Sequence, residues 1–228
     1  MRAAWISDLT ERESYSIAGD IHHHLVHVVR ISVGDDLLLL NGLGLAIKTQ
    51  VEAITKKAII LKHLETLESK RGISFDIVIG VPKKEALELC LKEATEIGVR
   101  KIFLIRGDYS QVKVPEDDRI LKILVSALEQ SNSPFLPEVI VSEWETIPWN
   151  DYACKLLMDS QTLNPTQNKQ TPDSTLLIIG PEGGFSPKEL SYLHAREGLE
   201  VLKLPTPILR TPTALAVGAG IILERLMD

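Results

Sequence analysis

The sequence predicts an α/β protein made of a β-rich N-terminal domain and a C-terminal domain with a parallel sheet and covering helices. Short strand-like runs with close turns fill residues 1–72, whereas strands and helices alternate through residues 73–228. A glycine-rich turn joins a strand to a helix at residues 180–185, which is typical of ligand-binding α/β sheets. The chain has 228 residues, 44% of them hydrophobic, which is enough for two folded domains. We therefore expect domains at 1–72 and 73–228.

The N-terminal domain contains one helical stretch among its strands. Residues 21–30 place Ile21, Leu25 and Val28 on one helix face. Asn41-Gly42 is a tight-turn signal. Strand-like runs lie at 37–40, 45–53 and 58–63. Strands this short, joined by close turns, predict a small barrel.

In the C-terminal domain, apolar strand-like runs alternate with helical patterns. Strands are expected at 74–80, 101–106, 139–144, 155–158, 175–179 and 200–204. Helices are expected from Pro82 to a cap at Gly98, over 119–131, and over 214–226. The polar stretch 160–174 predicts a mobile loop. This alternation predicts a parallel sheet with helices on its faces.

The net charge of −6 argues mildly against a nucleic-acid partner, but the charge is uneven. Residues 1–72 hold 9 Lys+Arg and 9 Asp+Glu, so the other 16 basic and 22 acidic residues give the rest of the chain its −6. Any RNA would therefore be attracted mainly by the N-terminal domain.

Several other classes of protein are disfavoured by the sequence. The apolar runs are too short to span a bilayer and the N-terminus lacks a signal-peptide core, so we expect a cytoplasmic protein with no membrane contact. Cys90 and Cys154 lie in apolar surroundings and predict buried thiols rather than a disulfide. The histidines within 22–27 have no Cys or carboxylate partner at useful spacing, which favours surface histidines over a metal site.

The glycine-rich segment 180–185, Gly-Pro-Glu-Gly-Gly-Phe, follows the strand at 175–179 directly. Ser186 can cap the next helix, Pro187 fits its first turn, and Glu189 can complete a capping box. This order places free backbone groups at the carboxyl edge of a sheet, where glycines let the main chain approach a ligand. If this segment is considered alone, an ordinary connecting turn is the simpler interpretation. Its glycine spacing fits neither a dinucleotide-binding fingerprint nor a P-loop.

A proline-rich loop, 205–213, precedes a helix at 214–226 that is rich in small residues. Small residues would let another backbone pack closely against this helix. Arg210 is the one cation of the loop. Alternatively, the prolines only rigidify a turn and Arg210 is solvated.

Together these segments resemble the paired signature of the ribosomal RNA small subunit methyltransferase E family, a SPOUT family that methylates N3 of a uridine in small-subunit rRNA. The signature residues are Gly180-Pro181-Glu182-Gly183-Gly184, Ile208-Leu209-Arg210-Thr211 and Thr213-Ala214. Upstream, residues 92–99, 129–131 and 24–35 resemble the family segments K-x-T-E-L-G-V, E-Q-S and H-L…V-L-R…G-D, in the same order. The resemblance therefore runs nearly end to end.

The resemblance implies a PUA-like RNA-binding domain, a SPOUT domain with a deep trefoil knot, and a homodimer with its active site near the interface. The implied cofactor is S-adenosylmethionine, and the implied substrate is small-subunit rRNA, free or within an assembled small ribosomal subunit. The implied cofactor-binding residues are Met158, Ile179, Gly180, Glu182, Gly183, Gly184, Leu204, Pro205, Ile208, Leu209 and Thr213. The implied RNA contacts are Arg2, Arg30, Glu129 and Gln130.

Arg210 is the candidate catalytic residue. The uridine N3 is weakly acidic and must lose its proton, so an adjacent cation would favour the charge that results. Arg210 could instead grip an RNA phosphate, or pin its loop by hydrogen bonds to carbonyls. For Glu182, a structural role capping local amides is favoured over contact with the cofactor.

The chain also departs from the family pattern. Residues 205, 207 and 212 are prolines, where the family has Gly, Arg and Glu respectively. The segment Asp108-Tyr109-Ser110 occupies the position of the family's E-R-S. Ser133 and Phe135 stand where the family usually has arginines, so fewer phosphate contacts are expected. Two alternatives follow: a SPOUT methyltransferase acting on another RNA, or a non-catalytic RNA-binding or ribosome-assembly protein that keeps the knotted fold.

Overall fold

The chain divides into two compact units in a computed structural model that describes residues 1–72, 75–110, 113–162 and 174–227. The units are Met1–Arg71 with Val125–Leu136, and Gly72–Leu124 with Pro137–Asp228. We call them unit 1 and unit 2.

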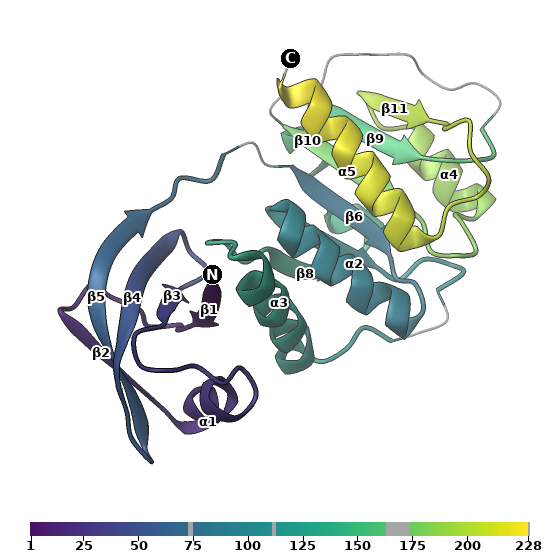
Figure 1. Ribbon diagram of the computed structural model, residues 1–228. Helices are drawn as coiled ribbons and strands as arrows, with labels where there is room; N and C mark the ends of the chain where they lie inside the picture. The colour runs from purple at the N-terminus through teal and green to yellow at the C-terminus, as the bar shows by residue number, and fades with distance from the viewer. Residues whose placement is uncertain (73–74, 111–112, 163–173, 228) are drawn as a thin grey trace. The chain divides into compact units, whose positions relative to one another are not determined.

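Unit 1 is a curled, five-stranded sheet with one short helix (Figure 1). Its elements are β1 (Arg2–Trp5), β2 (Ser14–Ala18), α1 (Gly19–His27), β3 (Asp36–Leu40), β4 (Leu45–Ile54) and β5 (Ala58–Glu68). The strand order is β1-β3-β4-β5-β2; β1 runs parallel to β3, and the other neighbours are antiparallel. The predicted β-rich N-terminal part is thus confirmed, in the form of a half-barrel whose sheet has two edges.

The run Leu37–Leu40 is apolar throughout because both faces of β3 are covered. Leu37 and Leu39 belong to the core of unit 1 that also contains Leu25 of α1. Leu38 and Leu40 face the other way and pack with Leu128. Helix α1 is shorter than the expected 21–30: it ends at His27, and Arg30 has a left-handed backbone with φ of 56°.

Unit 2 is a six-stranded sheet with the order β11-β9-β10-β6-β7-β8, and every neighbouring pair is parallel. Its strands are β6 (Asp76–Gly80), β7 (Lys101–Ile105), β8 (Glu138–Ser142), β9 (Cys154–Met158), β10 (Thr175–Ile179) and β11 (Leu199–Leu202). Its helices are α2 (Lys84–Ile97), α3 (Asp117–Ser131), α4 (Pro187–His194) and α5 (Thr211–Met227), with 3-10 turns at Trp144–Thr146 and Trp149–Asp151. The end of α3, from Val125 onward, belongs to unit 1.

Helices cover both faces of this sheet, as the alternating pattern predicted. Figure 1 shows α2 and α5 side by side on one face, where Gly218 of α5 approaches Leu177 of β10. Leu176 and Ile178 of the same strand point to the opposite face and share a core with Leu193 of α4.

A buried carboxylate fixes the start of the central strand β6. Asp76 is fully buried and accepts hydrogen bonds from Arg100 Nε (2.9 Å) and Nη2 (2.8 Å) and from the Lys101 backbone N–H (3.0 Å). The hydroxyl of Tyr152 donates to it as well, at 2.6 Å. The cluster ties β6 to β7 and to the segment before β9. As predicted, Cys90 and Cys154 are free, buried thiols.

Several predicted boundaries differ from the structure. The strand expected at 139–144 ends at Ser142, and the one expected at 200–204 ends at Leu202. The C-terminal helix begins at Thr211 rather than 214, because Pro212 is tolerated in a first turn, where its missing N–H has no partner to lose. Most of the loop predicted at 160–174 lies outside the described residues. The trefoil knot stays a prediction.

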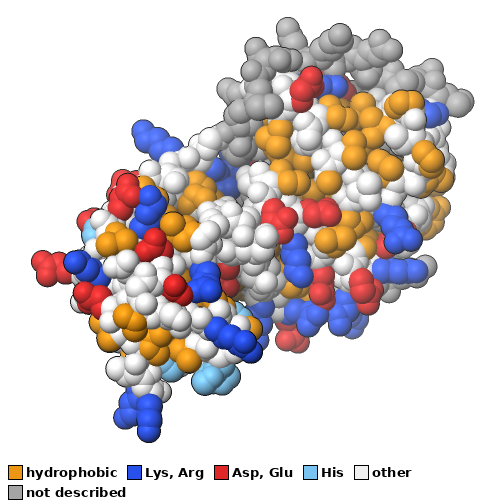
Figure 2. Space-filling view, viewed as in Figure 1, with side chains coloured by type: hydrophobic (Ala, Val, Ile, Leu, Met, Phe, Trp, Pro, Cys, Tyr) orange, Lys and Arg blue, Asp and Glu red, His pale blue; other side chains and the backbone are white. Residues whose placement is uncertain are grey.

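Helix α5 presents an apolar outer side. Ala216, Val217 and Gly220 are exposed there, and Figure 2 shows hydrophobic side chains gathered along this helix. In the parts of the chain that the structure describes, no helix is both long and apolar enough to cross a membrane.

Candidate functional site

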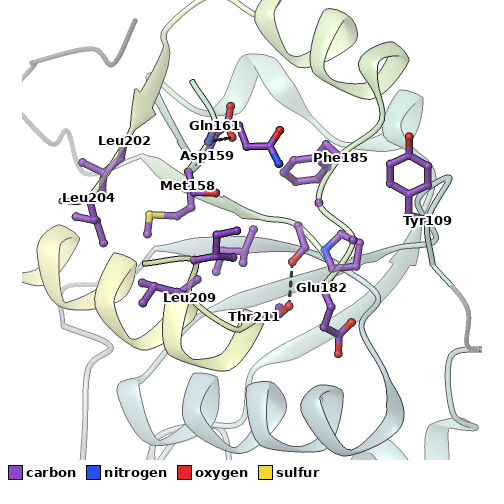
Figure 3. Close-up of a pocket in the computed structure, with 18 of the residues that line it drawn as sticks. Tyr109, Met158, Asp159, Gln161, Glu182, Phe185, Leu202, Leu204, Leu209 and Thr211 are labelled. Carbon is purple, nitrogen blue, oxygen red and sulfur yellow. Dashed lines mark hydrogen bonds between the residues drawn. The ribbon is translucent and has the colours of Figure 1, made fainter. Parts of the chain in front are cut away.

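A cavity of about 450 Å³ lies at the carboxyl edge of the sheet in unit 2, where the neighbouring strands β11, β9 and β10 end (Figure 3). The segments that follow these three strands provide most of its lining. The order β11-β9-β10 explains why loops distant in the sequence meet at one place. The volume lies within the range of small-molecule and cofactor sites, about 300–1,000 Å³.

Most of the predicted cofactor-binding residues come together in this cavity. Nine of them line it: Met158, Ile179, Gly180, Glu182, Gly183, Gly184, Leu204, Ile208 and Leu209. The other two, Pro205 and Thr213, are exposed and do not belong to the lining. Thr213 lies on the outer side of α5 because the helix starts earlier than the sequence suggested.

Other lining residues were missed by sequence reasoning. They include Tyr109, Asp159, Gln161, Phe185, Leu202, Pro207 and Thr211. Tyr109 comes from the loop after β7, two strands away from β10, so its position depends on strand order. Asp159 and Gln161 directly follow β9, and their place after a parallel strand could have marked them.

The glycine-rich turn is held to the start of α5. The Thr211 hydroxyl, in a residue that is 3% exposed, donates to the Gly180 carbonyl at 3.1 Å. Gly184 has a φ of 72° and donates its N–H to the Pro181 carbonyl at 2.9 Å. A direct hydrogen bond therefore joins the 180–185 turn to the first residue of α5, immediately after the 205–210 loop.

Glu182 extends away from this turn toward α2. Both of its carboxylate oxygens lie 3.2 Å from the backbone nitrogen of Lys83, the N-cap residue of α2, and accept its N–H. A carboxylate at this place is favoured by the unpaired amides and the dipole of the helix. The structural role considered for Glu182 therefore has a defined partner.

Glu189 connects α4 to the loop after β7. The predicted capping box is confirmed: Ser186 Oγ accepts from the Glu189 N–H at 3.2 Å, and Glu189 Oε2 accepts from the Ser186 N–H at 2.8 Å. Glu189 Oε1 also accepts from the Asp108 N–H (3.3 Å) and from Trp144 Nε1 (3.2 Å). At Gly107, a Cβ would lie 2.6 Å from that same oxygen, so a larger residue there would displace the Glu189 carboxylate.

Arg210 stands directly before α5, and its carbonyl accepts the Ala214 N–H at 2.8 Å. Its side chain is exposed and is not part of the cavity lining. Among the described residues, its guanidinium has no hydrogen bond or ion pair, so it does not pin the loop to carbonyls there. The guanidinium is available to an external anion.

The four predicted RNA contacts all lie in unit 1. Arg2 forms an ion pair with Asp35 at 2.5 Å, while Arg30 and Gln130 are exposed. Glu129 is half-buried and accepts the Trp5 backbone N–H at 2.9 Å. Burial raises the pKa of the Glu129 carboxyl, against the lowering effect of the Trp5 hydrogen bond. Glu129 therefore holds β1 in place, which gives it a structural partner.

Residues 69–223 match the family model described as an RNA methyltransferase domain. The chain belongs to this family. Residues 17–63 of this RNA methyltransferase family member also match the model described as an RNA methyltransferase PUA domain. The two matches fall on the β-rich N-terminal part and on the parallel-sheet part, as the sequence resemblance implied.

Individual relatives of this family member match along most of the chain. The ribosomal RNA small subunit methyltransferase E of Rickettsia conorii is 27% identical over 91% of this chain and 88% of its own length. The enzyme of the same name from Bacillus subtilis is 25% identical, with 90% and 88% covered. A crystal structure of the Neisseria gonorrhoeae ribosomal RNA small subunit methyltransferase E bound to S-adenosylmethionine superimposes with a TM-score of 0.85 at 19% identity, covering 98% of this chain and 97% of that one. This last similarity shows the shared fold.

Proposed function

We propose that this protein transfers a methyl group from S-adenosylmethionine to small-subunit ribosomal RNA, at N3 of a uridine. The observation that carries the proposal is the cavity at the ends of β9, β10 and β11, within a chain whose similarity to methyltransferases named for this substrate is nearly end to end. A ribosomal substrate is consistent with a cytoplasmic protein.

The cavity lining fits the proposed cofactor. Apolar side chains from two segments can enclose an adenine ring: Met158 at the end of β9, and Leu204 and Leu209 in the loop after β11. The glycines bring backbone close: a Cβ on Gly180 would lie 3.2 Å from the ring of Phe185, which also lines the cavity. When bound, S-adenosylmethionine supplies an electrophilic methyl group, so the protein needs only to orient the partners and exclude water.

Arg210 is the proposed catalytic residue. The Arg210 guanidinium is exposed, has no partner in the described ranges of the chain, and lies one residue from the Thr211–Gly180 hydrogen bond, so it can approach an RNA base or phosphate at the cavity. Near the uracil ring it favours loss of the N3 proton, because it stabilises the resulting negative charge. Arg210→Gln should then lower kcat and move the pH–rate profile to higher pH, with unchanged affinity for S-adenosylmethionine. Lys92→Gln, which removes an exposed cation from α2, is the control and should change neither. A uniform loss of RNA affinity without a shifted profile would assign Arg210 to a phosphate instead.

We also propose that unit 1, roughly residues 1–72, holds RNA, and that two copies pair through the outer side of α5. Ala216, Val217 and Gly220 form an exposed apolar stripe there, and small side chains allow close helix packing. Val217→Asp should convert a dimer to monomers in sedimentation, whereas Leu64→Asp on β5 should not. A monomeric wild-type protein would refute the pairing.

The activity is tested on small ribosomal subunits from cells that lack this protein. Purified protein and radiolabelled S-adenosylmethionine should label the small-subunit rRNA, and mapping should locate the label at N3 of a uridine. Label on a different RNA would favour the alternative substrate. Calorimetry with S-adenosylmethionine tests the remaining alternative. If the protein neither binds the cofactor nor labels any RNA, the results favour a non-catalytic RNA-binding protein.

A further inference from the structure

A second cavity of about 490 Å³ adjoins the cofactor cavity in unit 2. Three residues, Tyr109, Glu182 and Gly183, line both. The rest of the second lining comes from the ends of β6 and β7 and the loops that follow them. Any group held in this second space would therefore lie directly beside the site proposed for the methyl donor.

Tyr109 forms the wall between the two spaces and is 48% exposed. Figure 3 shows it at one end of the cofactor cavity next to Phe185, with Leu204 toward the opposite end. Its hydroxyl forms no hydrogen bond with the residues that the structure describes. A Cβ on Gly183 would lie 3.1 Å from Tyr109 Cβ, so this glycine lets the turn pass close to the ring's base.

The backbone under Tyr109 is firmly held, although the ring is exposed. Asp108 donates its N–H to Glu189 and accepts the Ser186 hydroxyl at 2.6 Å. Gly107 donates its N–H to Ser110 Oγ at 3.0 Å, and the Ser110 N–H donates to the Gly107 carbonyl at 3.0 Å. An exposed aromatic ring whose own backbone segment is hydrogen-bonded in this way is a preorganised stacking surface, because little of that segment's freedom remains to be lost on binding.

The second cavity also carries polar groups suited to the edge of a base. Lys83, Asp108 and Ser110 line it, which offers a cation, a carboxylate and a hydroxyl. This combination of one aromatic face with a few polar groups is what an extruded nucleobase requires.

We propose that the second cavity receives the acceptor nucleobase, extruded from its RNA strand, and that Tyr109 is the residue on which that base stacks. This inference rests on the proposed function and assigns its acceptor subsite. It also gives a physical meaning to the tyrosine that stands where the resembled family has arginine: stacking on the base replaces a charged contact.

The test replaces Tyr109 and measures methyl transfer to small ribosomal subunits. Tyr109→Ala should lower kcat/KM for RNA on the order of ten- to hundredfold, whereas Tyr109→Phe and Tyr109→Trp, which keep an aromatic face, should stay close to wild type. Because Tyr109 also lines the cofactor cavity, affinity for S-adenosylmethionine is measured separately, and its change in Tyr109→Ala should be much smaller than the change in kcat/KM for RNA. The unfolding temperature should not change in any of the three. Val141→Ala, at an exposed position on β8, is the control for surface truncation and should have no effect.

Stacking is read directly by fluorescence. In a short RNA, a fluorescent uridine analogue replaces the mapped acceptor base, and its emission should be quenched by wild type and Tyr109→Phe but not by Tyr109→Ala. Equal activity and equal quenching in wild type and Tyr109→Ala would overturn the stacking role alone. Absence of methyl transfer by the wild-type protein to any RNA would overturn the proposed function, and the acceptor subsite with it.

Discussion

Replacing Thr211 by valine tests whether the two loops of the cofactor cavity depend on each other. The substitution keeps the shape of a side chain that is 3% exposed and removes one hydrogen bond, from Thr211 Oγ1 to the Gly180 carbonyl at 3.1 Å. A typical bond of this kind contributes about 1 kcal/mol net. Gly180 is only half-buried, so water can partly replace the lost donor, and the cost should not greatly exceed that value.

A loss of about 1 kcal/mol should lower the unfolding temperature by roughly 2–4 °C in a protein of this size. Affinity for S-adenosylmethionine should also fall, because Gly180 and Thr211 both line the cavity and the bond fixes the start of α5, where the loop of Leu209 ends. If the whole loss appeared in binding, the dissociation constant would rise about fivefold. Thermal unfolding and isothermal calorimetry measure the two effects on the same samples.

Thr213→Val is the matched control. Thr213 lies two residues further along α5, is exposed, and does not line the cavity. The same chemical change should therefore leave both stability and affinity nearly unchanged. If Thr211→Val and Thr213→Val behave alike in both measurements, the hydrogen bond does not join the two loops in the way that the structure implies.

Three further substitutions test other parts of the fold by urea unfolding. Asp76→Ala should cost about 3 kcal/mol, since it leaves a half-exposed arginine head group, a backbone N–H and a tyrosine hydroxyl without their shared, fully buried acceptor; a loss below 1 kcal/mol would contradict this. Burial raises the pKa of Glu129, so the folded state binds this proton more tightly than the unfolded state, and the free energy of unfolding should fall as pH rises from the ordinary value of 4.5 through the raised pKa. Glu129→Gln should remove this fall, while Glu52→Gln at an exposed position should keep it. Gly218→Val should cost about 2 kcal/mol by overpacking, because a Cβ there already lies 2.9 Å from a buried leucine side chain of β10, and unchanged stability would contradict the close approach of α5.

Local signals in the sequence predicted the glycine-rich turn well. The strand at 175–179 has the bounds observed for β10, and the capping box of Ser186 and Glu189 forms as expected. Gly98 ends α2 with a φ of 90°, a conformation that favours glycine. These features depend on residues within a few positions of each other, so the sequence carries them directly.

Features that depend on strand order were out of reach. Tyr109 joins the cavity only because β7 lies next to β6, which lies next to β10. Likewise, the side chain of Glu129 meets the Trp5 N–H across 124 positions of sequence, and no periodicity in α3 indicates that contact. The residues missed at the site are therefore those placed by tertiary contacts rather than by their neighbours in the chain.

The cavity is held open by hydrogen bonds within the protein. Thr211 joins the turn after β10 to α5, and Glu182 joins that turn to the start of α2. Glu189 joins α4 to the loop that carries Tyr109. Because these bonds exist before any ligand arrives, little ordering of the segments that they hold remains to oppose binding of the cofactor and the base. Loss of one bond should therefore displace a loop and weaken ligand binding, even where the fold survives. The ligand affected should be the one whose cavity is lined by the displaced loop.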